Sequence, residues 1–104
     1  MNSAALSVLE EEGVHGPEAE TSLRRVLAVL AAQSRELRRH LDELGLRIED
    51  VDPTLARTTQ IVRRLHDAGL DKARSRLLFG HRGAKAISTL MRRIERLEEL
   101  EDES

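Results

Sequence analysis

Cysteine is absent from the 104-residue sequence, and so are tryptophan and tyrosine. Without cysteine the chain cannot form disulfides or use a thiolate as a nucleophile or metal ligand. Phe79 is the single aromatic residue, and one ring does not form the series of stacking platforms that holds single-stranded bases. These absences exclude thiol chemistry, disfavour base stacking and fit the reducing cytosol.

Long apolar segments are also missing. The longest apolar run, Val26 to Ala32, is far shorter than the roughly 20 residues that a membrane-spanning helix needs. No Lys or Arg precedes Arg24, so the chain lacks the basic start of a secretory signal. We therefore expect a cytoplasmic protein without membrane association.

Charged residues make up 35% of the chain, and they are unevenly distributed. Residues 1–20 and 98–104 each carry five acidic residues and no Lys or Arg. Residues 57–96 carry eleven Lys and Arg against three Asp and Glu. The pattern is typical of solvated helix faces, and it also allows an anion-binding surface whose acidic ends screen it.

Apolar residues recur at alternating spacings of four and three from position 23 onward, with Ser34 where one member is missing. Such a seven-residue repeat keeps one side of a helix apolar and favours packing against another helix. It predicts one long helix over 18–50 whose apolar side exceeds what the short helices can cover. We expect this seam to be an interface with a second copy (a homodimer or higher) or with another helical protein. Its residues are Leu23, Leu27, Leu30, Leu37, Leu41, Leu44 and Ile48.

Proline and glycine positions divide the rest of the chain. Pro17 and Pro53 suit first helical turns, Gly69 suits a helix end, and Asp71 suits a helix cap. We predict an all-α fold, an antiparallel helical bundle or hairpin completed by oligomerisation. Residues 1–16 form a flexible acidic segment, residues 17–101 a single helical domain, and residues 102–104 an acidic tail end. The predicted helices are 18–50, 53–68, 71–79 and 82–100.

Basic residues of the C-terminal half are the candidate anion or nucleic-acid contacts. The segment 79–85 combines two glycines, basic side chains and a predicted helix start, a setting in which backbone N–H groups bind anions. Residues 61–80 can also be aligned with a helix-turn-helix, with Gly69 at the turn, although Arg64 and Leu65 fit its core positions poorly. The candidate contacts are Arg63, Arg64, Lys72, Arg74, Arg76, His81, Arg82 and Lys85.

Metal binding and catalysis receive little support. Glu36, His40 and Glu43 lie on one helix face at spacings of four and three, but they lie beside arginines and outside the apolar seam. We interpret them as a solvated charged face and expect no metal, cofactor or catalytic residue.

Residues Leu46 to Asp52 with Leu55 resemble the first-helix pattern of the all-helical chorismate mutases. The helix of that family continues where Pro53 stands here. The only glutamines are Gln33 and Gln60, so the C-terminal active-site glutamine of the family has no counterpart. The resemblance covers only the residues named and does not lead us to expect an enzyme.

Two functional hypotheses remain. The first is a non-enzymatic helical protein–protein interaction module (an adaptor, chaperone-like protein or regulatory subunit) that self-associates through the heptad seam. The alternative is a nucleic-acid-binding regulatory protein that uses the basic residues of 57–96, with the acidic ends as modulators.

Overall fold

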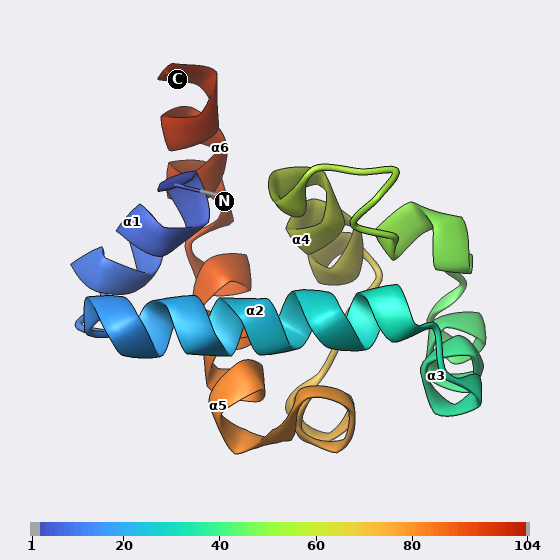
Figure 1. Cartoon of the computed structure of the whole chain (residues 1–104). Helices are drawn as coiled ribbons and strands as arrows, with labels where there is room; N and C mark the ends of the chain where they lie inside the picture. The colour runs from blue at the N-terminus through green and yellow to red at the C-terminus, as the bar shows by residue number, and fades with distance from the viewer. Residues whose placement is uncertain (1–2, 104) are drawn as a thin grey trace.

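The structure, a computed structural model, describes residues 3–103, and these form six α-helices and one 3-10 helix without a strand (Figure 1). The all-α prediction is confirmed. None of the helices in the described part of the chain is long and apolar enough to cross a membrane. The elements are α1 (Ser3–Glu11), α2 (Gly16–Ala32), α3 (Arg35–Leu44), η1 (Ile48–Val51), α4 (Thr58–Asp67), α5 (Lys72–Arg92) and α6 (Ile94–Glu103).

Helix α2 lies across the molecule in Figure 1, with α1 and α6 beside each other near one end and α3 at the other. Its principal neighbour is α5. The core that they share with the other helices is made of aliphatic side chains and the fully buried Phe79. Residues from α1 to α6 contribute to this one core, for example Leu9, Leu23, Leu65 and Leu97.

The prediction of one helix over 18–50 is wrong, because the chain turns between α2 and α3. Gln33 adopts a left-handed conformation with φ 52°, and Ser34 caps α3 by accepting a hydrogen bond from the Leu37 N–H at 3.1 Å. Gly45, with φ 78°, ends α3. Ser34 is therefore a helix cap where the heptad pattern placed a gap within one helix.

The prediction of a flexible segment over 1–16 is wrong for residues 3–16. They include helix α1, whose Ala5, Val8 and Leu9 are fully buried. Because these three side chains share one helix face, docking α1 onto the core removes a continuous apolar surface from water. Met1 and Asn2 lie outside the described residues.

The helix predicted over 53–68 begins later, at Thr58. Asp52 holds residues 52–56 in a turn, because its carboxylate accepts from the Thr54 N–H at 2.9 Å and its carbonyl accepts from the N–H groups of Leu55 and Ala56. Pro53 therefore lies in this turn and not in a helical first turn.

The predicted helices 71–79 and 82–100 divide differently in the structure. Asp71 caps α5 as expected, accepting from the Arg74 N–H at 2.8 Å. Helix α5 then continues to Arg92 across a break at Gly80, where φ is 74° and ψ is 178°. A new helix, α6, begins at Ile94 and includes residues 102 and 103 of the predicted tail, and Ser104 lies outside the described residues.

Candidate nucleic-acid interface

Four residues of the predicted heptad interface lie in the core of the single chain. Leu23, Leu30, Leu37 and Leu41 are at most 1% exposed, so in this structure they do not face a second chain. Leu27, Leu44 and Ile48 are half-buried and pack against that core. The turn at Gln33 and Ser34 makes this burial possible, because it places α3 where its leucines face the same core as those of α2.

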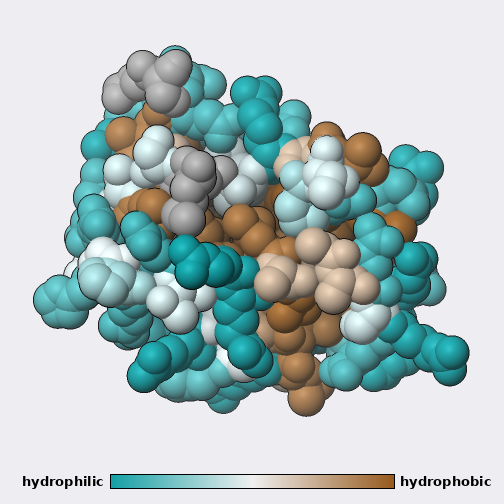
Figure 2. All heavy atoms as spheres, viewed as in Figure 1, coloured by the Kyte–Doolittle hydropathy of each residue, from teal (hydrophilic) through white to brown (hydrophobic). Residues whose placement is uncertain are grey.

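An apolar groove remains on the outer face of α2. It has a volume of about 310 Å³ and is lined by Leu23, Arg24, Leu27, Ala28, Ala31 and Pro53. Leu55, two residues after Pro53, is 68% exposed. In the view of Figure 2, hydrophobic residues gather over the C-terminal half of α2 and on the surface below it.

Three of the eight candidate basic contacts are engaged inside the protein. Arg63 donates to both carboxylate oxygens of Glu98, at 3.0 and 2.6 Å, which lowers the pKa of that carboxyl group. Arg64 donates to the backbone carbonyl of Asp50 at 2.8 Å. The third, Arg74, donates to Glu43 and lowers its pKa. These guanidinium groups hold helices together and have carboxylate or carbonyl partners already.

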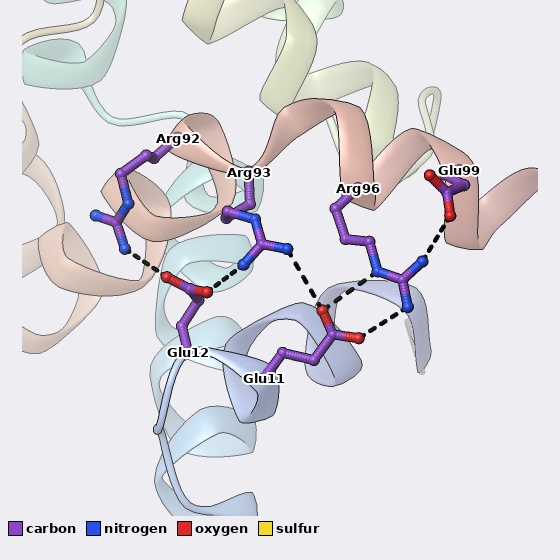
Figure 3. A network of polar contacts seen from close by, with 6 residues as sticks. All are labelled: Glu11, Glu12, Arg92, Arg93, Arg96 and Glu99. Carbon is purple, nitrogen blue, oxygen red and sulfur yellow. Dashed lines mark hydrogen bonds and ion pairs between the residues drawn. The ribbon is translucent and has the colours of Figure 1, made fainter.

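A second engaged group ties α1 to α5 and α6 (Figure 3). Arg92 and Arg93 both donate to the Glu12 carboxylate, and the hydrogen bond from Arg92, at 2.9 Å, is the main reason that the pKa of Glu12 is lowered. Arg96 donates to Glu11 at 3.0 Å and lowers its pKa in the same way. The acidic residues near both ends therefore neutralise arginines of this protein. Glu98 pairs with Arg63 in the same manner, so these carboxylates are not free screening tails.

The other five candidate contacts have no hydrogen bond or ion pair from their side chains to any described residue. All five are exposed and belong to α5. They are Lys72, Arg76, His81, Arg82 and Lys85.

Four of these five side chains border one cleft of about 320 Å³. Lys72 and Arg76 come from the part of α5 before Gly80, and His81 and Lys85 from the part after it. Glu12 also borders the cleft, but its charge is neutralised by two arginines. The cleft is therefore strongly cationic. The remaining lining residues are Val14, Ala84, Ser88, Thr89 and Arg92.

A larger hollow, of about 750 Å³, lies where α4 meets the junction of α5 and α6. Its lining includes Arg63, Arg93 and Arg96, and each of these forms an ion pair with a glutamate. An incoming anion would have to compete with those carboxylates. The smaller cleft on α5 is the better anion site for this reason.

Within the set Glu36, His40 and Glu43, Nδ1 of His40 lies 3.8 Å from Oε1 of Glu43, and Arg74 contacts both groups. His40 is buried and its Nδ1 lies 3.0 Å from Nη1 of Arg74. Because arginine only donates, Nδ1 accepts and the ring proton belongs on Nε2, which is buried and has no partner among the described residues. In residues 3–103 no group of three or more His, Asp and Glu side chains is arranged to hold a metal ion.

Sequence reasoning missed four polar or charged residues that line the α5 cleft, namely Glu12, Ser88, Thr89 and Arg92. Ser88 lies three residues after Lys85, and Arg92 lies four residues after Ser88, so helical periodicity offered a signal for both. Glu12 is 60 residues before Lys72 in the chain and offered no signal. Compared with protein-family models, with curated proteins and with solved structures, the chain matches none of them.

Proposed function

We propose that the protein is a non-catalytic helical module that binds the phosphate backbone of nucleic acid through the α5 cleft. One observation carries this proposal: four basic side chains of α5 that have no partner among the described residues border one hollow. By contrast, Arg63 on α4, Arg92 on α5 and Arg96 on α6 are paired with carboxylates. A site that binds phosphates needs cations that are not already neutralised.

The lining of the cleft suits phosphate more than base edges or bases. Lys72 and Lys85 supply ammonium groups, and the guanidinium of Arg76 can donate two hydrogen bonds to one phosphate. The lining holds no Phe, Trp or Tyr on which a base could stack. We therefore expect binding that depends little on sequence, and such a ligand is compatible with the cytoplasmic location expected above.

The direct test is fluorescence anisotropy with a labelled DNA duplex of mixed sequence and with an RNA of the same sequence. Arg76→Glu reverses one unpaired charge in the cleft and should weaken binding about tenfold. Arg24→Glu is the matched control, because Arg24 has no partner among residues 3–103 and borders the α2 groove instead. Equal losses in the two variants, or no binding by the unaltered protein at low salt, would refute the proposal.

Self-association is a second candidate function, and the α2 groove is the observation that favours it. The groove is almost entirely apolar, and the exposed Leu55 lies two residues from Pro53 in its wall. A projecting side chain beside a recess allows two copies to bind each other by the same contact across a two-fold axis. Of the predicted heptad interface, this surface retains Leu23 and Leu27.

Light scattering after size exclusion, over a concentration series, tests this candidate. Ala31→Glu places a charge in the groove and should reduce the mass of any dimer to that of one chain. Ala73→Glu introduces the same change at an exposed position of α5 outside the groove and should leave the mass unchanged. A single-chain mass for the unaltered protein at every concentration would eliminate self-association.

A further inference from the structure

The cationic residues of the α5 cleft would not share a face in a straight helix. Arg76 and Lys85 are nine residues apart, as are Lys72 and His81. Nine residues are about two and a half turns at 3.6 residues per turn, so the members of each pair would project from opposite sides. Each pair would also be separated by about 13.5 Å along the axis. A continuous α5 would therefore carry two opposed cationic stripes and no cleft.

The break at Gly80 changes this geometry. Its φ of 74° with ψ of 178° is a conformation that essentially only glycine adopts. The break reorients the second half of α5 relative to the first, and Lys72 and Arg76 then border the same hollow as His81 and Lys85. The non-helical backbone at Gly80, and not the 3.6-residue period of the helix, brings the basic residues of the α5 cleft together.

Arg25 of α2 holds this break. Its Nε donates a 2.6 Å hydrogen bond to the carbonyl of Phe79, the residue immediately before Gly80. Its guanidinium also packs so close to Gly80 that a Cβ there would lie 3.1 Å from Nη2. Because the helix is interrupted at Gly80, the Phe79 carbonyl benefits from a donor outside the helix.

Packing supports the same geometry from the other side. Phe79 is fully buried, and Gly83 lies so close that an added Cβ would be 2.8 Å from the Phe79 Cβ. Val26, the neighbour of Arg25 on α2, contacts the same position. The first turn after the break is thus fixed between Phe79 and α2.

We propose that Arg25 is a positioning residue: by binding the Phe79 carbonyl it fixes the Gly80 break and so keeps the two cationic halves of α5 on one cleft. The proposal rests on the proposed function for its binding consequence, and its structural consequence can be measured independently. Arg25 is not among the residues that line the cleft, so its effect is indirect.

The first experiment compares Arg25→Ala with Arg24→Ala in DNA-binding affinity. Both variants remove one positive charge from adjacent positions of α2, and the Arg24 side chain makes no hydrogen bond to residues 3–103. We expect Arg25→Ala to weaken binding about tenfold more than Arg24→Ala, because the cations on one side of the break leave the cleft. Arg25→Lys should restore most of the affinity, since its ammonium group can still donate to Phe79.

A second experiment measures the break directly. The chain has no native cysteine, so spin labels attached at Ala73→Cys on α5 and Glu95→Cys on α6 report a distance that spans Gly80 and the α5–α6 junction. Arg25→Ala should broaden or shift that distance distribution, and Arg24→Ala should not. Gly80→Ala, which keeps every charge, should reproduce both the shift and the loss of affinity.

The outcomes separate the two proposals. If the unaltered protein does not bind nucleic acid, the proposed function fails, and the spin-label distances still test the role of Arg25. If Arg25→Ala and Arg24→Ala weaken binding equally, or if Arg25→Ala and Gly80→Ala leave the distance distribution unchanged, the positioning role is refuted. Should Arg25→Ala fail to fold, Arg25→Lys and Gly80→Ala provide the same comparison in folded protein.

Discussion

Basic side chains in this protein fall into a paired and an unpaired group, and local sequence patterns distinguish them only in part. Arg63 pairs with Asp67 at a spacing of four and with Glu98, whereas Arg76 has no acidic residue three or four positions away and no partner among the described residues. Glu98, which accepts two hydrogen bonds from Arg63, is 35 residues away, and sequence patterns do not identify pairs at such separations. The structure therefore reduces the eight candidate contacts to the five that are unpaired.

Ser34 offers a residue-scale prediction. Its hydroxyl accepts from the Leu37 N–H and caps α3, so Ser34→Ala should lower the free energy of unfolding by about 1 kcal/mol. Ser34→Asp keeps an acceptor and should remain near the original stability. Urea denaturation followed by far-UV circular dichroism measures both variants.

A continuous helix through α2 and α3 would give the opposite change in stability for Ser34→Ala. If α2 and α3 formed the single helix that the heptad pattern predicts, position 34 would lie on its apolar side. Alanine would then stabilise the protein, because alanine has the higher helix propensity and serine is polar. An increase in stability for Ser34→Ala would contradict the turn at Gln33 and Ser34.

At the scale of elements, sequence reasoning identified most helices and misplaced their ends. Asp71 and Gly69 carry local signals that depend only on backbone geometry, and both occur where they were expected. Pro53 carried an equally strong signal, but the carboxylate and carbonyl of Asp52 stabilise a turn there instead. Local rules state which residues can begin a helix, and competing hydrogen bonds decide which of them do.

The heptad seam also shows what a local sequence pattern leaves undetermined. Its leucines were correctly identified as residues that need burial, but periodicity does not reveal whether the cover is supplied by the same chain or by another. In the structure α3 turns back at Ser34, and Leu37 and Leu41 enter the single-chain core. Helix α1, with no expected role in packing, contributes Val8 and Leu9 to that core.

Helix α1 provides the element-scale prediction. Leu9 is fully buried, so Leu9→Ala should destabilise the protein by about 2–5 kcal/mol through lost burial and a residual cavity. Leu77→Ala is the matched control, because Leu77 is 66% exposed and its truncation should change stability by no more than about 0.5 kcal/mol. Chemical denaturation compares the two. Equal, small effects would mean that α1 is not docked on the core.

At the scale of the whole molecule, the net charge of −2 does not show that some charged residues form internal ion pairs while others remain unpaired on the surface. Acidic residues from both ends of the chain neutralise arginines on α4, α5 and α6, for example Glu12 on Arg92 and Glu98 on Arg63. These pairs join elements that are distant in the sequence. Because these ion pairs engage the acidic residues, the cations of the α5 cleft remain available to a ligand even though the protein as a whole is slightly negative.

The salt dependence of nucleic-acid binding is the sharpest test of phosphate binding in the α5 cleft. For the unaltered protein, the logarithm of the DNA-binding constant should fall linearly with the logarithm of the salt concentration. Each phosphate contact contributes a slope of about −0.9. Contacts from Lys72, Arg76 and Lys85 predict a slope of about −2.7.

The double variant Arg76→Ala/Lys85→Ala should reduce that slope by about two and weaken binding to all sequences alike. Its control, Arg24→Ala/Arg39→Ala, removes the same charge from exposed positions of α2 and α3 that do not line the cleft, and it should leave the slope unchanged. A slope near zero for the unaltered protein, or the same reduction in both double variants, would contradict binding of phosphates in the α5 cleft.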